Sequence, residues 1–236
     1  LVIILLALFL YYLSTMRIKN LLAIEKLKSK LAADLHDNIG SGLTEISILS
    51  EVASRKNNDD HKYADVELNK ISDISRQLVD NMSDIVWVVN PNRDSLHDLI
   101  LRLKDSYSEP LNSLGISFKA KHLEKLENVK LPMDVKQNLY LIFKEAINNS
   151  IKHSNCKQIT LDANLRNDVL EISLTDDGIG FDEESITKGN GLRNMENRAS
   201  QIGGRIKMKT STNAGTSIRF IGKPESKNKL KLLFNK

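Results

Sequence analysis

The stretch Glu145-Ala-Ile-Asn-Asn149-Ser-Ile-Lys152-His153 decides how the second half of this chain is expected to fold. Glu145, Asn149 and His153 recur every four residues, so an α-helix presents an acid, an amide and an imidazole on one face. A purely structural helix has little reason to align those three groups. Carboxylate and amide oxygens suit Mg²⁺, which keeps several waters and bridges phosphates. The stretch therefore predicts a helix that faces a phosphate-bearing ligand.

Three glycine-containing loops follow this helix. Asp176-Asp177-Gly178-Ile179-Gly180-Phe181 comes directly after a predicted strand, where a carboxylate can accept a hydrogen bond from an exocyclic amine. Gly189-Asn190-Gly191-Leu192 opens a helix whose free N–H groups and dipole suit phosphate oxygens. Gly215-Thr216 precedes the last strand. Glycines let these loops turn sharply and approach a ligand closely.

Hydrophobic periodicity predicts a mixed α/β region around the loops. The predicted helices cover residues 95–114, 135–153 and 191–202. The predicted strands cover residues 116–120, 159–165, 169–175, 205–210 and 216–221, with a turn at Arg166-Asn167-Asp168.

The first half of the chain predicts a helical hairpin. One long helix runs from Arg17 to about Lys56 and breaks at Asn57-Asn58-Asp59-Asp60. Its apolar stripe consists of Leu27, Leu31, Leu35, Ile39, Leu43, Ile46 and Leu49. A second helix ends at Asn90-Pro91 and carries a heptad seam of Leu68, Ile71, Ser75, Leu78, Met82, Ile85 and Val89. Such a hairpin cannot bury its own stripe, so we expect a homodimeric four-helix bundle.

His36 lies on the flank of the first stripe, about 100° around the helix from Leu35. Asp37, the next residue, can fix the imidazole tautomer and raise the nucleophilicity of the far nitrogen. The pair can therefore accept a proton or a phosphoryl group. A solvated surface pair has the same local sequence, so the interpretation depends on the other motifs.

The first thirteen residues, LVIILLALFLYYL, are uninterrupted apolar and are followed by Arg17 and Lys19. Interfacial tyrosines with cations just beyond them are typical of a helix that leaves a membrane on the cytoplasmic side. The run is shorter than the roughly 20 residues of a full span. We expect residues 1–16 to be the carboxyl end of a transmembrane helix. A buried core helix is the alternative, and a signal peptide would need a basic leader and a cleavage site.

The amino-acid composition narrows the possible classes of protein further. The chain has 236 residues, 41% of them hydrophobic, which allows one large domain or two modest ones. The formal net charge of +4 comes entirely from the tail, residues 223–236, which holds five lysines and one glutamate and is predicted to be disordered. Only 5% of the residues are aromatic, which argues against a nucleic-acid partner. The single cysteine, Cys156, excludes an internal disulfide and is expected in the core.

In combination, these motifs resemble a known family. The 145–153 helix, DDGIGF, GNGL and GT look like the N, G1, G2 and G3 boxes of the GHKL ATP-binding fold, in that order. With Leu35-His36-Asp37 on a long helix behind a membrane exit, the chain resembles sensor histidine kinases that partner NarL/FixJ-type response regulators. Gly40-Ser41-Gly42-Leu43 and the segment 84–91, DIVWVVNP, are similar to Bacteroidetes-type members. The resemblance covers residues 26–222, and the short segment between Phe181 and Gly189 fits a short ATP lid.

The resemblance implies a fold and an activity. It implies an α-helical hairpin that dimerises into a four-helix bundle, followed by an α/β two-layer sandwich of the GHKL (Bergerat) type. The implied domains are a membrane segment at 1–16, a dimerisation and phosphotransfer hairpin at 17–92, an ATP-binding domain at 93–222 and the tail at 223–236. His36 would accept the γ-phosphoryl group of ATP, with Asp37 as general base. The phosphoryl group would then pass to an aspartate of a response regulator.

The resemblance also implies a nucleotide site. Asn149 would bind Mg²⁺ with support from Glu145, and Lys152 and His153 would approach the phosphates or ribose. Asp176 would bind the adenine amine. The remaining implied nucleotide contacts are Gly178, Gly180, Gly189, Gly191, Leu192 and Thr216.

One position departs from the family pattern His-Asp-x-x-x-Gln. Ser41 stands where the glutamine is taken to position water for dephosphorylation of the regulator, so phosphatase activity is in doubt. The expected protein is an ATP-dependent protein-histidine kinase in the inner membrane, cytoplasmic from about residue 17. The alternatives are a GHKL ATPase that uses ATP to drive a conformational change and a nucleotide-binding scaffold without phosphotransfer.

Overall fold

A computed structural model of the chain describes residues 2–56, 61–122, 126–182 and 189–223. In the first two helices, only the backbone is described at residues 19, 20, 23, 24, 26–28, 30–38, 55, 56 and 61–64. The chain divides into two compact units, residues 1–90 and 91–236. We call them the hairpin unit and the sandwich unit. The tail predicted to be disordered lies outside the described residues from position 224 onward.

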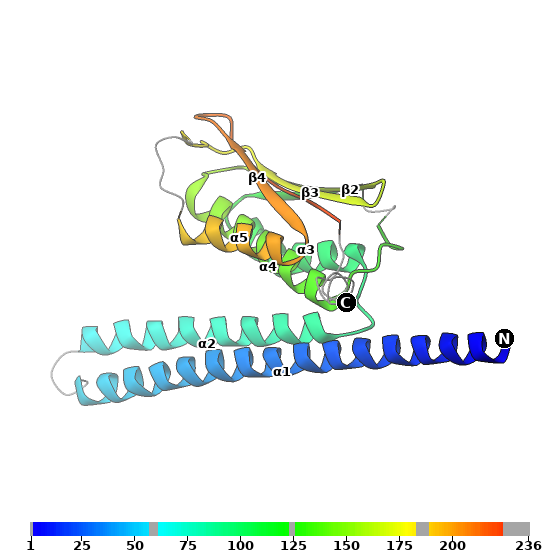
Figure 1. Ribbon diagram of the computed structural model, residues 1–236. Coiled ribbons are helices and arrows are strands. Elements are labelled where there is room, and N and C mark those ends of the chain that lie inside the picture. The colour runs from blue at the N-terminus through cyan, green and yellow to red at the C-terminus, as the bar shows by residue number, and fades with distance from the viewer. Residues whose placement is uncertain (1, 57–60, 123–125, 183–188, 224–236) are drawn as a thin grey trace. The chain divides into compact units, whose positions relative to one another are not determined.

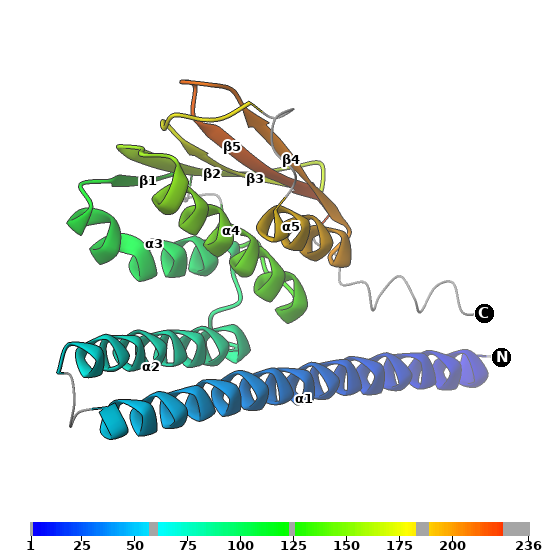
Figure 2. The same cartoon turned by 90° about the vertical axis from the view of Figure 1, so that its left-hand side faces the viewer.

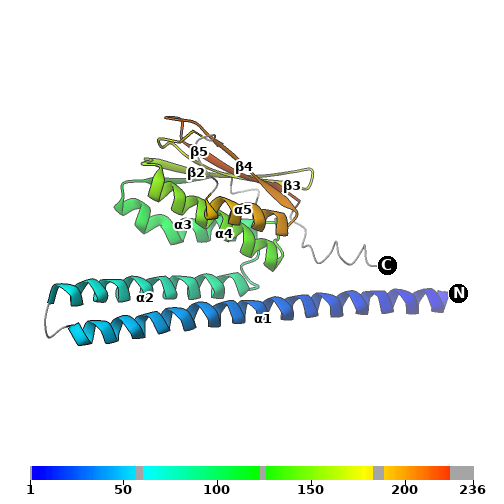
Figure 3. The ribbon, with the colours of Figure 1, turned by 60° about the vertical axis from the view of Figure 1, so that its left-hand side comes forward.

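Two long helices, α1 (Val2–Lys56) and α2 (His61–Val89), form the hairpin unit. They lie side by side and antiparallel (Figures 1 and 3). Gly42 of α1 faces Leu78 of α2, and a Cβ added to Gly42 would lie 2.7 Å from the Leu78 Cδ2. α2 ends before Pro91, because a proline disfavours helical backbone at the residue that precedes it. The predicted helical hairpin is confirmed, and its first helix continues back to Val2.

The first turns of α1 carry exposed apolar side chains, from Val2 through Leu13. Across the described residues, no helix combines the length and the apolar character that crossing a bilayer requires.

α2 leaves part of its apolar surface uncovered. Its residues Leu78 and Ile85 are half-buried within the hairpin. On another stripe of the helix, Val79 and Val86 are each 65% exposed and Leu68 is 56% exposed. These three residues share one face, because their spacing of eleven and seven residues returns to nearly the same angle of the helix.

The sandwich unit has two layers. Its sheet contains β1 (Ser117–Lys121), β2 (Gln158–Arg166), β3 (Val169–Asp176), β4 (Gly204–Thr210) and β5 (Thr216–Gly222), in the order β1-β2-β3-β5-β4. Its helices are α3 (Leu96–Ser113), α4 (Met133–His153) and α5 (Asn190–Gln201). Figure 2 shows all three helices on one face of the sheet. The predicted two-layer α/β sandwich is therefore confirmed.

Local sequence explains where these elements start and stop. Ser95 and Asp98 form a capping box at the start of α3, where each side chain accepts from the other residue's backbone N–H. Asn167 and Asp168 join β2 to β3 with positive φ angles of 49° and 62°, as a two-residue hairpin turn requires. β1 pairs parallel with β2, so the intervening α4 forms a crossover, and the other strand pairs are antiparallel.

The core of the sandwich unit lies between the helices and the sheet. Alternate residues of β2 and β3 are buried against the helices, which leaves the other half of each strand on the opposite face. The buried residues are led by Leu139, Ile142 and Phe143 of α4. Cys156 is also buried, and burial raises the pKa of its thiol, as expected for a core residue.

Candidate functional site

The polar face of α4 meets the start of α5. Glu145 and Asn149 are half-buried, and the Glu145 Oε1 lies so close to Gly191 that any side chain at position 191 would overlap it. The Asn149 Nδ2 would be 3.6 Å from the same added Cβ. The structure thus brings together Glu145, Asn149 and Gly191, which are up to 46 residues apart in the sequence. Lys152 and His153 are exposed in the last turn of α4.

Asp176 ends β3 as a buried carboxylate with only 4% of its surface exposed. Its Oδ1 accepts from the backbone N–H groups of Gly178 at 3.1 Å and Thr216 at 3.2 Å. Its Oδ2 accepts from the Ser150 hydroxyl at 2.9 Å. A carboxylate offers about four acceptor positions, so Asp176 keeps one for a ligand donor. Its orientation is fixed before any ligand arrives.

The neighbouring Asp177 has a different role. It is exposed, and its Oδ1 accepts from the backbone N–H groups of Lys157 and Gln158, each at 2.8 Å. The N–H of Gln158 is the main cause that holds the pKa of Asp177 below its ordinary value. Asp177 therefore ties the β3 loop to the start of β2 and points away from the buried site.

The glycines of the first loop, Gly178 and Gly180, have no room for a side chain, because backbone atoms of other segments pack directly against them. A Cβ on Gly178 would overlap the carbonyl oxygen of Ser154, and one on Gly180 would overlap that of Ser211. Gly180 also has a positive φ of 54°. The Ile179 N–H donates to the Ser154 carbonyl at 2.8 Å, which fastens the loop to the end of α4.

Thr210, at the end of β4, links two of the predicted loops. Its hydroxyl accepts from the Phe181 N–H at 3.1 Å and donates to the Gly215 carbonyl at 3.2 Å. It also lies 3.1 Å from the Thr216 hydroxyl. A Cβ on Gly215, where φ is 71°, would overlap the carbonyl oxygen of Asp176. The Asp176 and Gly215 loops are therefore held together as one backbone cradle.

Sequence reasoning missed three residues of this cradle: Ser150, Ser154 and Thr210. Ser150 and Ser154 follow Asn149 at one and five residues, and the Ser154 hydroxyl donates to the Ser150 carbonyl at 2.6 Å. The helical spacing from the motif could have indicated both serines. Nothing local distinguishes Thr210 from other strand residues, because its role depends on pairing with Thr216 across the sheet.

The start of α5 presents free backbone donors. Gly189 is the N-cap in extended backbone, and none of the described residues caps the helix with a side chain. None of the described residues lies within 4 Å of a Cβ added at Gly189, and Leu192 is half-buried one turn further on. Uncapped N–H groups at a helix start suit an anion. Residues 183–188, which include most of the predicted short lid, lie outside the described residues.

The predicted phosphoacceptor pair lies in the other unit. The backbone of His36 and Asp37 is helical within α1, while their side chains lie outside what the structure describes. Ser41 is exposed on the same helix. Within the described parts of the chain, no group of three or more His, Cys, Asp or Glu residues could hold a metal ion.

Two family matches cover most of the chain. Residues 28–94 match the family described as histidine kinase. Residues 134–226 match the family described as histidine kinase-, DNA gyrase B- and HSP90-like ATPase.

Individual relatives agree with these matches. An uncharacterized sensor-like histidine kinase of Chloroflexus aurantiacus is 26% identical over 209 residues, which are 86% of this chain and 35% of the relative. The sensor protein VraS of Staphylococcus aureus is 26% identical over 214 residues, which are 88% of this chain and 58% of the relative. The chain thus spans only part of the length of both relatives.

Solved structures share the fold at low sequence identity. The histidine kinase domain of the blue-light activated histidine kinase of Erythrobacter litoralis EL346 superimposes with a TM-score of 0.54 at 14% identity, over 80% of this chain and 98% of that chain. The histidine kinase AdeS of Acinetobacter baumannii gives 0.52 at 14% identity, over 78% and 96% of the two chains.

Proposed function

Since the chain belongs to the sensor histidine kinases, we propose that it is the kinase core of a two-component sensor, which autophosphorylates on His36. The phosphoryl group would then pass to an aspartate of a response regulator, of NarL/FixJ type by the resemblance of the hairpin. The single observation that carries the nucleotide half of this proposal is Asp176. It is a buried, oriented carboxylate that accepts from two backbone N–H groups and the Ser150 hydroxyl and keeps one acceptor position free.

The sandwich unit would bind ATP between the Asp176 cradle and α4. Asp176 would accept from the adenine amine, and Thr216 would close the adenine side. Gly178 and Gly180 would hold the Asp176 loop in the closely packed shape that faces the nucleotide. The start of α5, from Gly189 to Leu192, would receive phosphate oxygens. Lys152 and His153, exposed at the end of α4, would approach the phosphates or ribose.

Glu145 and Asn149 are suited to hold Mg²⁺. They supply a carboxylate and an amide oxygen beside Gly191, and Mg²⁺ needs only one or two protein oxygens because it keeps waters and binds phosphates. When bound, the ion would neutralise charge on the phosphates. Asn149 would be the direct ligand, with Glu145 acting through water or a hydrogen bond.

Transfer to His36 depends mainly on alignment. An imidazole nitrogen would form a bond to the γ-phosphorus while the bond to the bridging oxygen breaks, and ADP would leave with the electron pair. Asp37 would orient the imidazole and take the proton of the ring. Little further covalent assistance is required once the two groups are in line.

The hairpin unit would form a four-helix bundle with a second copy. The exposed stripe of Leu68, Val79 and Val86 supports this, because an apolar stripe of that length on one helix face needs a partner surface. Residues 1–16 would be the end of a transmembrane helix, which would place the chain at the inner membrane. Phosphatase activity is not part of the proposal, since Ser41 stands where the family has glutamine.

The proposal is tested with γ-labelled ATP and Mg²⁺. The wild-type chain should acquire label that is stable in base and lost in acid, as a phosphoramidate is, while the His36→Gln variant should acquire none. Persistent label in His36→Gln would contradict the proposal. ATP turnover that does not depend on His36 would favour a GHKL ATPase, and ATP binding without label would favour a nucleotide-binding scaffold.

A further inference from the structure

The sheet of the sandwich unit has a second face that α3, α4 and α5 do not cover (Figure 2). We call it the open face. The charged side chains that the strand alternation places there are mostly cationic. They are Lys119, Lys121, Arg166, Arg205, Lys207, Lys209 and Arg219, with Asp162 and Glu171 as the carboxylates.

Both carboxylates of the open face already have partners. Glu171 pairs with the Arg219 Nη1 at 2.8 Å, and Asp162 lies 2.7 Å from the His122 Nδ1. The other six cations have no carboxylate partner among the residues that the structure describes. The chain without its tail is neutral overall, so this face concentrates positive charge.

Protection of the sheet edges explains only part of this charge. Lysines on the edge strands β1 and β4 discourage pairing with other chains. Lys207, however, is directly opposite Arg219 of the inner strand β5. Like charges in register destabilise a strand pair, and edge protection does not require an arginine on the inner strand. Glu171 offsets part of this repulsion through its ion pair with Arg219, and an anionic partner would offset the charge that remains at Lys207 and Lys209.

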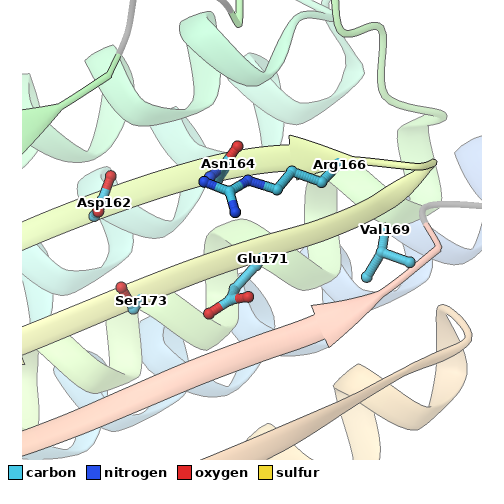
Figure 4. A pocket seen from close by; sticks show the side chains of 6 residues that line it. All are labelled: Asp162, Asn164, Arg166, Val169, Glu171 and Ser173. Atoms are coloured by element: carbon cyan, nitrogen blue, oxygen red, sulfur yellow. The ribbon is translucent and has the colours of Figure 1, made fainter.

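The open face has two hollows, and the one over β4 and β5 suits an anionic partner. One shallow hollow is lined by Lys207, Lys209, Ser217, Arg219 and Ile221, which supply three cations and a hydroxyl. A second hollow, over β2 and β3, is mixed in charge, and Figure 4 shows Arg166 and Glu171 on its two strands. Both hollows lie on the open face and away from the Asp176 cradle.

The hairpin unit limits how far the sandwich unit can be from a membrane. Gly42 faces Leu78, so the end of α2 at Val89 lies opposite about residue 31 of α1. At 1.5 Å per residue, that position is about 20 Å beyond Arg17 along α1. If residues 1–16 end a transmembrane helix, as proposed above, the first residue of the sandwich unit lies within one domain diameter of the bilayer surface.

We propose that the open face around Lys207, Lys209 and Arg219 is a docking surface for the anionic phospholipid headgroups of that bilayer. The phosphate oxygens of the lipids complement Lys207 and Lys209 in the β4–β5 hollow, where Arg219, which is paired with Glu171, adds a third cation. The tail continues this charge in the sequence, since five lysines follow directly after β5. The inference rests on the proposed membrane segment.

The test uses the whole chain on vesicles that contain an acceptor-labelled lipid. A donor dye is attached at Thr175→Cys on the open face or, as a control, at Glu109→Cys on α3. Energy transfer from position 175, but not from 109, should be higher on phosphatidylcholine vesicles with added phosphatidylglycerol than on phosphatidylcholine alone. K207E/K209E should weaken this lipid-dependent contact by at least about tenfold. The matched exposed pair K104E/K157E should retain it.

The outcomes distinguish a failure of the lipid-docking surface from a failure of the proposed kinase function. Equal energy transfer on both lipids, or an equal loss in both charge-reversal variants, would overturn the docking surface. A defect of K207E/K209E in transfer to the response regulator without any lipid effect would assign the face to an acidic protein and would also overturn it. Retention of the chain on phosphatidylcholine alone reports the membrane segment, and labelling of His36 in detergent reports the kinase.

Discussion

The hairpin unit and the sandwich unit carry their functional residues in opposite ways. In the sandwich unit, the residues that would bind the nucleotide also hold the fold, since Gly178, Gly180 and Asp176 are packed against backbone or hydrogen-bonded to it. In the hairpin unit, the helical spacing of the sequence predicts that His36 lies beside the apolar stripe and outside it. A substitution at His36 should therefore remove its chemical role without unfolding the hairpin unit. A substitution in the nucleotide site of the sandwich unit needs a control for stability.

Replacing a glycine by alanine should have opposite effects in the two units. Gly178→Ala forces a Cβ into the Ser154 carbonyl oxygen, so we expect a loss of about 3 kcal/mol of stability and no measurable ATP binding. At Gly40→Ala, no described atom lies within 4 Å of the new Cβ, so the change should stabilise α1 by up to about 1 kcal/mol. Urea unfolding and calorimetric titration with a non-hydrolysable ATP analogue measure both effects. A Gly178→Ala chain that binds the analogue normally would contradict the packing argument.

Within the sandwich unit, substitutions of the adjacent acids Asp176 and Asp177 should affect ATP binding and protein stability differently. Asp176→Asn removes the charged acceptor for adenine, so we expect ATP to bind about 10–100-fold more weakly. Asp177→Asn weakens only the bonds to the N–H groups of Lys157 and Gln158, so it should lower stability with little change in ATP affinity. Titration and thermal unfolding of the two variants provide the comparison. Equal losses of affinity would show that the two acids do not differ in role.

Sequence alone predicted the order and type of nearly every element, because the periodicity changes sharply at Pro91 and each strand is bounded by a turn signal. It placed Asp176 at a strand end. The structure adds the reason why Asp176 can face a ligand and Asp177 cannot, since Asp177 is bonded to the start of β2. The sequence could not predict that β5 inserts between β3 and β4. Thr210 was missed for the same reason, since its contact with Phe181, 29 residues away in the sequence, arises from that strand order. Local patterns do not encode pairing between distant segments.

Charged residues on the exposed stripe of α2 should leave the fold of the hairpin unit intact but should weaken the proposed dimer. Val79 and Val86 are each 65% exposed, so Val79→Asp with Val86→Asp should leave the helical content unchanged. Two carboxylates at a dimer seam would be buried without partners, so we expect the dimer to dissociate at least about tenfold more readily. Sedimentation at several concentrations measures this. Gln77→Asp, exposed on the opposite side of α2, is the control and should leave the dimer unchanged.

The smallest expected effect is a pH dependence of stability in the sandwich unit. The folded chain lowers the pKa of Asp177, first through the Gln158 N–H, so its contribution is complete above the unfolded pKa of about 3.9 and is lost as pH falls through the lower folded value. The difference in unfolding free energy between the wild type and Asp177→Asn should therefore be constant near neutral pH and shrink below about pH 5. Urea unfolding at a series of pH values measures it. A difference that grows on acidification would mean that Asp177 is stabilised in its protonated form, and the tie between β3 and the start of β2 would have to be reassigned.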